Sequence, residues 1–326
     1  MSITLKDVAV KAGVTVTTVS RVINNRGPIS EKTREKVYRV MKELNYQPNE
    51  AARSLAKKHT KIIGVIVPSV KNPFFAEIVE YLEYYASQRQ YKIMLCNSYH
   101  QKDKEIEYIE MLKTNKVTGI VISSRTEGIK EYLGTNMPVV SFERVISSDI
   151  SAVACDNYMG GVLATQCLLD CGCRYVGHIG GTVNVSMIAD ERCRGFLDVC
   201  EQAGVSHKVF MTEESQFESM NYTEFLEDLL TDNPDIDGIF CSSDVIAAEL
   251  IYACSRRGLQ IPQDMKIVGF DDINVATLVT PHITTIHQPL SQMCSAAIDK
   301  IIDMKEKKSL PSRTILSVTL CKRETT

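Results

Sequence analysis

This chain of 326 residues lacks the features that would place it in a membrane or outside the cell. No run of apolar residues approaches the ~18 that a membrane span requires. The first residues, Met1 to Asp7, contain no basic region followed by an apolar stretch, so no secretory signal is visible. We therefore expect a cytoplasmic protein that does not associate with membranes.

The 11 cysteines do not form a recognisable metal site or disulfide framework. Even the nearest cluster, Cys167, Cys171 and Cys173, lacks paired C-x2-C elements. In a cytosolic chain of this length, buried free thiols are the better interpretation. We expect neither a metal nor a cofactor.

Motifs of the common enzyme classes are also missing. The chain has no H-E-x-x-H, no G-x-S-x-G and no P-loop. His178 and His287 lie in apolar, strand-like contexts, where we expect packed, hydrogen-bonded histidines rather than catalytic ones. The sequence gives no positive indication of an enzyme.

The composition that is present is ordinary, but its charge is unevenly distributed. Hydrophobic residues make up 44% and charged residues 24%, as in soluble globular proteins, and the length allows two or three compact units. Residues 1–60 hold 12 Lys and Arg against 5 Asp and Glu, whereas the remainder holds 25 against 35. A basic head on an acidic body indicates that the head meets a polyanion.

Three short helices are predicted in the head. Thr4 is an N-cap with Asp7 three residues on, and Thr15 and Ser30 cap the second and third helices. Gly13 ends the first helix, as expected where the backbone must take a positive φ.

The spacing Ala9…Gly13…Val19 is typical of a helix-turn-helix. Ala9 lets two helices cross closely, Gly13 makes the turn, and Val19 fills the angle between the helices. A plain three-helix bundle would explain the apolar stripes, but not the solvent face of the second helix, which suits a DNA major groove. The residues expected to contact DNA are Thr15, Val16, Thr17, Ser20, Arg21 and Asn24.

Residues 47–60 could be a flexible linker. However, Pro48 followed by Ala-Ala-Arg-Ser-Leu-Ala has good propensity for a short helix. Two turns of helix are marginal alone in water. We therefore expect a hinge helix that orders only against DNA and a second copy of itself.

From Lys61 onward, apolar runs alternate with amphipathic helical stretches. This pattern predicts an α/β body of parallel sheets covered by helices on both faces. Some ten strands over ~260 residues fit two doubly wound lobes better than one. Eight candidate strands can be located: Ile62–Val67, Lys92–Cys96, Gly119–Ser123, Val139–Phe142, Tyr175–Ile179, Gly238–Cys241, Ile267–Phe270 and Ile315–Leu320.

Polar and aromatic residues follow these strands, where doubly wound sheets bind ligands. Aromatic faces with carboxylates and an arginine suit a sugar. A purine stacked between Phe74 and Phe217 would fit the same set, and any one residue could instead be structural. The candidate effector-binding residues are Asn72, Phe74, Phe75, Ser123, Glu143, Arg192, Phe217, Asp244 and Asp271.

Several strings in the chain form long, ordered motifs. In the head they are Leu5-Lys-Asp-Val-Ala, Thr18-Val-Ser-Arg-Val-Ile-Asn24 and Leu44-Asn-Tyr-Gln-Pro-Asn49. In the body they are Asn72–Glu77, Asp190–Phe196, Ser243-Asp244, Val268–Asp272 and Thr284–Pro289. With these motifs the chain resembles, over essentially its whole length, the lactose-repressor (LacI/GalR) family, and within it the sugar-responsive branch near ribose and sucrose repressors.

For the head, the resemblance implies that Val16, Thr17 and Arg21 read bases in the major groove. Leu55, on the hinge helix, would be the wedge that enters the minor groove and bends the duplex. Paired hinge helices imply a homodimer on a near-palindromic, double-stranded operator. No heptad-bearing tail follows the last strand, which favours a dimer over a tetramer. The Phe75–Ser87 helix would form part of the surface through which the two copies of the dimer contact each other.

For the body, the resemblance implies a periplasmic-binding-protein-like module. Arg192 and Asp244 would form the main polar clamp on the effector. Phe74 and Phe217 would be its aromatic platform, and Glu143 a further contact where relatives often have Asp.

The same resemblance implies a division into a helix-turn-helix domain and a two-lobed effector domain joined by a hinge. The expected boundaries are 1–46 for the head, 47–60 for the hinge and 61–326 for the effector-binding and dimerisation domain. Lobe 1 would comprise about 61–157 and 289–316, and lobe 2 about 158–288 and 317–326.

We therefore expect a DNA-binding regulator of a metabolic operon, a repressor controlled allosterically by a small molecule. Purine-responsive relatives carry an arginine where this chain has Ser186, which favours a sugar or sugar phosphate. Alternatives are a purine effector, a sugar-binding protein without a regulatory DNA role, a sugar hydrolase, and a regulator with a vestigial pocket. The sequence also leaves a protein co-regulator open.

Overall fold

The computed structural model describes residues 3–46, 60–134, 137–181, 187–306 and 312–326. Its contacts divide the chain into two compact units, Met1–Thr60 and Lys61–Thr326. The predicted hinge helix with Leu55, and also Ser186, lie outside the described residues. No helix among the described residues is long and apolar enough to cross a bilayer.

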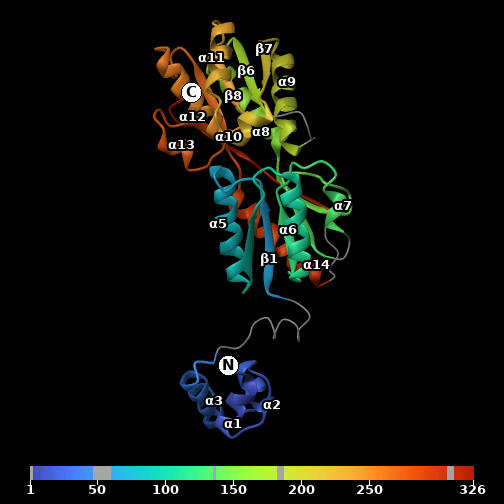
Figure 1. The fold of residues 1–326 in the computed structure, drawn as a ribbon. Helices are drawn as coiled ribbons and strands as arrows, with labels where there is room; N and C mark the ends of the chain where they lie inside the picture. The colour runs from blue at the N-terminus through green and yellow to red at the C-terminus, as the bar shows by residue number, and fades with distance from the viewer. Residues whose placement is uncertain (1–2, 47–59, 135–136, 182–186, 307–311) are drawn as a thin grey trace. The chain divides into compact units, whose positions relative to one another are not determined.

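The first unit consists of three helices held by the caps that the sequence predicts. The hydroxyl oxygens of Thr4, Thr15 and Ser30 each accept a hydrogen bond from the backbone N–H three residues on. Gly13, with φ 60°, ends the first helix. The helices are α1 (Leu5–Ala12), α2 (Val16–Ile23) and α3 (Glu31–Glu43), drawn in blue in Figure 1.

A small aliphatic core holds these helices together. Ala9 and Val19, the two residues that the helix-turn-helix spacing places between helices, are both buried in it. Its other fully buried members are Val8, Ala12, Val22, Val37 and Val40. Because these positions recur at helical spacing, the three helices were readable from the sequence.

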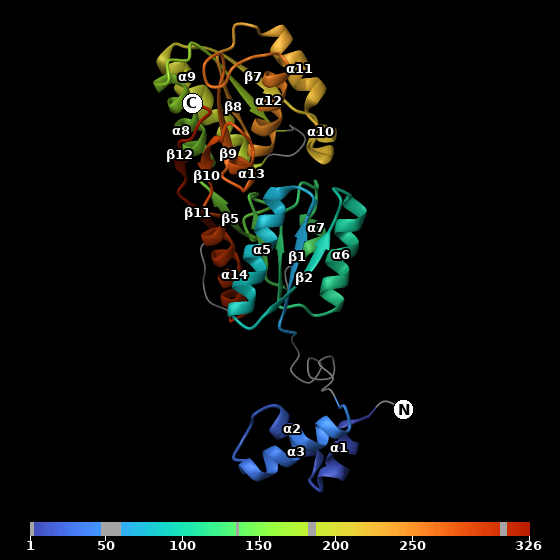
Figure 2. The same ribbon diagram turned by 90° about the vertical axis from the view of Figure 1, so that its left-hand side faces the viewer.

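The second unit contains two six-stranded sheets (Figures 1 and 2). The first sheet is parallel throughout, with strand order β11-β5-β4-β3-β1-β2. Its strands are β1 (Ile62–Val67), β2 (Lys92–Asn97), β3 (Gly119–Ile122), β4 (Val139–Phe142), β5 (Ser151–Cys155) and β11 (Arg313–Leu316).

The second sheet has order β12-β10-β9-β8-β6-β7, and only β12 runs antiparallel to its neighbour. Its strands are β6 (Tyr175–Gly180), β7 (Ser206–Met211), β8 (Gly238–Cys241), β9 (Lys266–Asp271), β10 (Thr284–His287) and β12 (Thr319–Cys321).

The central strands of each sheet are buried on both faces, which explains their continuous apolar runs. In β1, Ile63 and Val65 belong to the core beneath α5 and α14, whereas Ile66 belongs to the core beneath α6. The helices of the first lobe are α5 (Pro73–Gln88), α6 (Lys102–Thr114), α7 (Lys130–Leu133) and α14 (Leu290–Lys305).

The second lobe is covered in the same way. Val176 and Phe240 belong to the core with α8 and α9, and Ile179 and Ile239 to the core with α11 and α12. Its helices are α8 (Asn157–Asp170), the 3-10 turn η1 (Ile188–Asp190), α9 (Glu191–Ala203), α10 (Glu214–Ser219), α11 (Thr223–Asp232), α12 (Asp244–Arg256) and α13 (Val275–Leu278).

The chain passes between the lobes three times, from β5 to α8, from β10 to α14 and from β11 to β12. The third passage corrects one prediction. The single strand expected over Ile315–Leu320 is two strands in different sheets, separated by Ser317 and Val318. The strands β5, β7 and β10 were not predicted.

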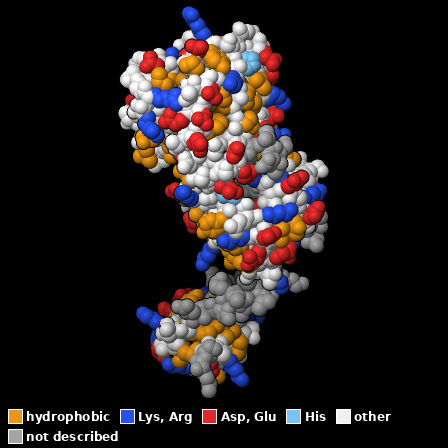
Figure 3. Space-filling view, turned by 45° about the horizontal axis from the view of Figure 1, so that its top comes forward, with side chains coloured by type: hydrophobic (Ala, Val, Ile, Leu, Met, Phe, Trp, Pro, Cys, Tyr) orange, Lys and Arg blue, Asp and Glu red, His pale blue; other side chains and the backbone are white. Residues whose placement is uncertain are grey.

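The cysteines and the surface charges complete the description of the body. All 11 cysteines are free thiols, and eight of them are buried, as expected; Cys171, Cys193 and Cys321 are partly exposed. On the face displayed in Figure 3, acidic, basic and hydrophobic side chains are interspersed over the body. The acidic excess of the body is therefore not gathered in one patch on that face.

Candidate functional site

The face of α2 opposite the head's core carries the residues predicted to meet DNA. Thr15, Val16, Thr17 and Arg21 are exposed there, and Val16 retains 43% of its accessible surface. An aliphatic side chain exposed at the start of a helix, beside hydroxyls and a guanidinium, has the chemistry that reads base edges.

The other two predicted contacts on α2, Ser20 and Asn24, are half-buried. The side-chain amide of Asn24 donates to the carbonyl oxygen of Ser20 at 2.7 Å, at the C-terminal end of the helix. This hydrogen bond occupies one of the two amide hydrogens and fixes the direction of the Asn24 side chain.

In the body, a cavity of about 520 Å³ lies at the carboxyl ends of the parallel strands. It is situated at the point where the strand order reverses in each sheet. This point lies between the neighbouring strands β1 and β3 in the first sheet, and between β6 and β8 in the second. Ligands of doubly wound sheets bind at this point. Residues of both lobes line the cavity, and its size falls within the roughly 300–1,000 Å³ of small-molecule sites.

Eight of the nine predicted effector-binding residues line this cavity. Asn72 is the N-cap of α5, and its side-chain oxygen accepts the N–H of Phe74 at 3.0 Å. Phe74 and Phe75 contact one another edge to face, with ring centroids 5.2 Å apart. The eight residues are Asn72, Phe74, Phe75, Ser123, Glu143, Arg192, Phe217 and Asp271.

Arg192 is the centre of a buried polar network on the cavity wall. Its Nε donates to Oδ1 of Asn157 at 2.7 Å, and its Nη1 donates to the carbonyl oxygen of Ser242 at 2.6 Å. The guanidinium also covers the ring of Phe270 at 3.5 Å from the centroid. A Cβ on Gly161 of α8 would overlap the carbonyl oxygen of Arg192, so glycine is required for the close approach of α8 to α9.

Two buried carboxylates, Glu143 and Asp271, each lie 4.0 Å from the Arg192 guanidinium. Glu143 follows β4 directly and Asp271 is the last residue of β9. Both have positive φ, 58° and 113°, in a region that non-glycine residues rarely adopt. Oε1 of Glu143 accepts the N–H of Cys155 at 2.7 Å, and Oδ1 of Asp271 accepts the side-chain amide of Gln288 at 2.6 Å. Backbone strain thus coincides with the residues that aim charge into the cavity.

Burial controls the protonation of this group. Desolvation raises the pKa of Glu143, and the Arg192 guanidinium and the Asn157 amide oppose that rise. Desolvation also raises the pKa of Asp271 to about 7, again opposed first by Arg192. A ligand hydroxyl entering the network therefore meets both hydrogen-bond donors and acceptors.

Asp244 is the one predicted effector-binding residue that the structure does not place on the cavity wall. It is fully buried, and its Oδ1 accepts the hydroxyl of Thr285 at 2.5 Å while its Oδ2 accepts the N–H of Ile273 at 3.0 Å. Desolvation, and then the charge of Asp271, raise the pKa of Asp244. Asp244 thus joins the start of α12 to β10, and the neighbouring Ser242 and Ser243 line the cavity instead.

The aromatic wall includes a cation that the sequence analysis missed. Arg125 covers the ring of Phe217 at 4.4 Å, and its Nε lies 3.7 Å from Oε1 of Glu214. Arg125 follows β3 by three residues, so the rule that found Ser123 could have found it as well. Further lining residues that were not predicted include Asp190, Thr212 and Tyr222.

The two histidines singled out in the sequence differ. His178 is buried, stacks on Phe240 with centroids 4.6 Å apart, and its Nδ1 lies 3.0 Å from the Phe240 carbonyl oxygen, as expected. Desolvation lowers the pKa of His178 to about 4. His287 is exposed rather than packed, because it ends β10, and its Nδ1 lies 2.9 Å from Oδ2 of Asp272.

Family models match both units of the chain. Residues 4–49 match the model described as bacterial regulatory proteins, lacI family. Residues 165–326 match the model of a periplasmic binding protein-like domain. The first match covers the helix-turn-helix, and the second covers most of the second lobe together with α14 and β11 of the first lobe.

Curated relatives match the chain from end to end. The ribose operon repressor of Halalkalibacterium halodurans is 39% identical, covering 99% of this chain and 97% of its own. The sucrose operon repressor of Streptococcus mutans is 37% identical, covering 98% of each chain. The repressor PurR of Proteus mirabilis is 34% identical, covering 96% of this chain and 93% of its own.

Solved structures match the fold. A periplasmic binding protein/LacI transcriptional regulator from Alkaliphilus metalliredigens, complexed with D-xylulofuranose, is 33% identical with a TM-score of 0.74, over 82% of this chain and 99% of that chain. The lac repressor dimer bound to operator and an anti-inducer is 24% identical with a TM-score of 0.88, over 100% and 99%. The chain therefore belongs to the lacI family of bacterial regulatory proteins, which are DNA-binding transcription regulators and not enzymes.

Proposed function

We propose that this regulator represses an operon and that a carbohydrate, bound in the cavity between its lobes, sets its affinity for operator DNA. The observation that carries the proposal is Arg192, held within 4.0 Å of both Glu143 and Asp271 beside the aromatic wall. A sugar presents C–H faces that pack on rings and hydroxyls that both donate and accept hydrogen bonds.

The relatives support the carbohydrate over other small molecules. Two full-length relatives repress ribose and sucrose operons, and the solved neighbour at 33% identity holds a pentulose. A purine is the second candidate, because a purine repressor is 34% identical over nearly the whole chain. The experiment below therefore also measures the effect of purines on operator affinity.

For the DNA contact, we infer that α2 reads the major groove through Val16, Thr17 and Arg21, with Thr15, Ser20 and Asn24 alongside. The exposed face of α2 and the basic charge of residues 1–60 support this assignment. Leu55, as a minor-groove wedge, belongs to the same proposal.

We also propose that the regulator acts in the cytoplasm as a homodimer. A symmetric protein matches a near-palindromic operator, because each half-site meets an identical head. Exposed apolar residues on the first lobe, among them Tyr84 on α5 and Leu95 on β2, support a contact there. The domain boundaries given above, with a hinge at 47–60, complete the proposal.

The test is operator affinity measured by fluorescence anisotropy at one salt concentration, with DNA from upstream of this protein's own gene. Sugars, sugar phosphates and purines are added in turn. We expect one carbohydrate to change the affinity severalfold, within the 5–150-fold range roughly typical of allosteric coupling.

The matched variants are Phe217→Ala, which removes one aromatic wall of the cavity, and Tyr252→Ala, which removes an exposed ring elsewhere on the body. Phe217→Ala should abolish the response to the sugar and retain DNA binding, and Tyr252→Ala should retain both. A response to purines alone would contradict the carbohydrate proposal. Asp244→Ala is a poor probe of the pocket, because Asp244 supports the fold behind it.

A further inference from the structure

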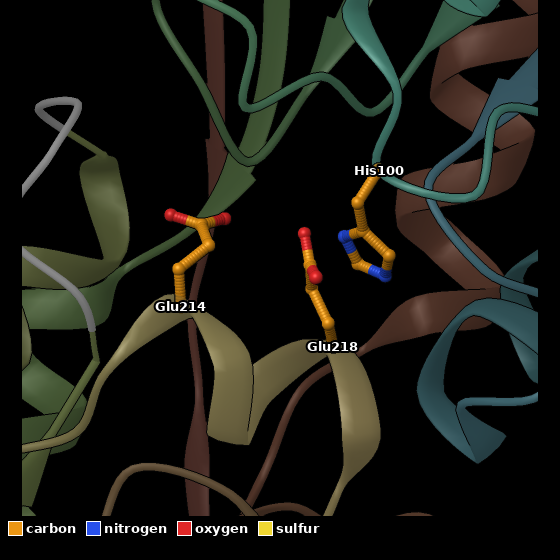
Figure 4. Close-up of side chains that lie close together, drawn as sticks. All are labelled: His100, Glu214 and Glu218. Carbon is orange, nitrogen blue, oxygen red and sulfur yellow. The ribbon is translucent and has the colours of Figure 1, made fainter.

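A second group of chemically active side chains lies beside the cavity, outside the Arg192 network. His100 comes from the segment between β2 and α6 in the first lobe, and Glu214 and Glu218 come from α10 in the second. One ligand atom from each of the three side chains lies within 4.8 Å of the others. Figure 4 shows the Glu218 carboxylate between the imidazole of His100 and the carboxylate of Glu214.

The donor set is one imidazole nitrogen and two carboxylate oxygens, which suits a divalent first-row transition-metal cation such as Zn²⁺ or Co²⁺. With metal–ligand bonds of about 2.0–2.1 Å, tetrahedral donors are roughly 3.3 Å apart. The observed 4.8 Å limit therefore requires the donors to approach by about 1.5 Å or less. Rotations of the glutamate side chains span such a distance without moving the backbone.

The surrounding structure directs these side chains toward one another. Glu214 and Glu218 are four residues apart on α10, so they project from the same face of the helix. Phe217, between them, contacts the His100 ring edge to face with centroids 5.4 Å apart. His100 and the preceding Tyr99 both have positive φ, 60° and 53°.

The charges around the group are mixed. Arg125 lies 3.7 Å from Glu214, which weakens a cation's attraction to that carboxylate. His100 and Glu218 would therefore be the principal ligands, and Glu214 the third. His100 is half-buried, so its imidazole is partly shielded from water.

We propose that His100, Glu214 and Glu218 form a site for a divalent transition-metal cation that bridges the two lobes at the rim of the cavity. Because its ligands belong to different lobes, the bound cation opposes their separation. Phe217 lines the cavity between two of these ligands, so the cation also holds one wall of the sugar site. The effect of the cation on the sugar site rests on the proposed function, whereas the metal site itself does not.

The experiment is a titration of the tag-free, full-length protein with Co²⁺. Calorimetry measures the affinity and the number of ions bound, and visible absorption reports the ligands. Co²⁺ reports its ligands, because thiolate ligation gives a charge-transfer band that imidazole and carboxylate ligation does not. The variants are His100→Ala in the first lobe and Glu218→Gln in the second. His207→Ala, an exposed histidine on β7, is the matched control.

We expect one Co²⁺ per chain without a thiolate band, and a loss of affinity of at least about tenfold in both site variants but not in His207→Ala. Glu218 is exposed, so Glu218→Gln should fold normally even if His100→Ala does not. Co²⁺ binding that is unchanged by Glu218→Gln, or a thiolate band, would overturn the site. Binding that is lost in Glu218→Gln but retained in a folded His100→Ala would overturn the bridge.

Discussion

The head and the body present the side chains of their proposed binding sites in opposite ways. On the head, Val16, Thr17 and Arg21 project from a helix whose other face forms the core. In the body, Arg192 and Glu143 are buried and joined to the backbone and to each other. The head offers an exposed surface, whereas the body offers a buried site whose polar groups need their hydrogen bonds and ion pairs.

This difference has a consequence for mutations. Exposed residues that cap no helix can change without altering the free energy of unfolding, because they bury little surface and few polar groups. Buried, paired charges cannot, since removing one leaves the other uncompensated. Substitutions in the head should therefore separate DNA binding from stability, and substitutions in the cavity wall should change stability together with ligand binding.

The largest effect is expected for Arg192→Met. It leaves Glu143 and Asp271 buried without their cation, so the body should lose about 3–5 kcal/mol of unfolding free energy. Urea denaturation followed by circular dichroism measures this loss. Adding Asp271→Asn should restore part of the stability, because it removes one uncompensated charge. Wild-type stability in Arg192→Met would show that the buried network is not coupled to the fold.

The next effect concerns pH. The pKa of His178 is about 4 in the folded protein against an ordinary value of 6.5, so between these pH values only the unfolded chain binds the proton. Stability should therefore fall as the pH drops from 6.5 to about 4, by ~3 kcal/mol for this one group. His178→Gln should lack that part of the decline. The stability of both proteins is measured by the urea midpoint of unfolding at pH 4.5 and at pH 7. An equal fall in the midpoint between these pH values in both proteins would contradict the prediction.

In the head, Arg21→Ala should weaken operator binding by about 1–3 kcal/mol, because a bidentate contact to a base is lost. The melting temperature should not change, since Arg21 is exposed. Arg39→Ala, which removes an exposed cation from α3, separates general charge from base reading. Equal losses of affinity in both variants, on operator and on unrelated DNA alike, would show that Arg21 does not read sequence.

The smallest effect is expected for Thr15→Ala, which removes the N-cap of α2. The Thr15 hydroxyl accepts the N–H of Thr18 at 3.1 Å, and such caps contribute about 1 kcal/mol. Amide hydrogen exchange in α2 should become roughly fivefold faster. Thr17→Ala, exposed on the same helix, is the control and should leave the exchange rates nearly unchanged.

The head could be predicted from the sequence almost completely, because its determinants are local. Each cap lies three residues from its partner, and the turn requires only Gly13. The body was less accessible. The residues of β5 are mostly small, β7 is a partly exposed edge strand and β10 begins with two threonines, so none carries the long aliphatic run that marks a buried strand.

The candidate site was predictable in position but not in every side chain. Glu143, which follows β4, and Asp271, the last residue of β9, line the cavity where the strand-end rule places them. Asp244 also follows a strand, β8, but its side chain turns to Thr285 on β10, which lies two strands away in the sheet. The sequence does not encode that choice locally, because it depends on which strands lie side by side. Arg125 was missed although it follows β3.

The central claim is that the sugar site in the body and the DNA face of the head are coupled. Sugar affinity should be measured by calorimetry for the protein alone and for the protein saturated with operator. The account predicts that operator changes sugar affinity by the same factor by which the sugar changes operator affinity, because coupling free energy is reciprocal. Equal sugar affinity with and without operator would contradict the account, even if both ligands bind tightly.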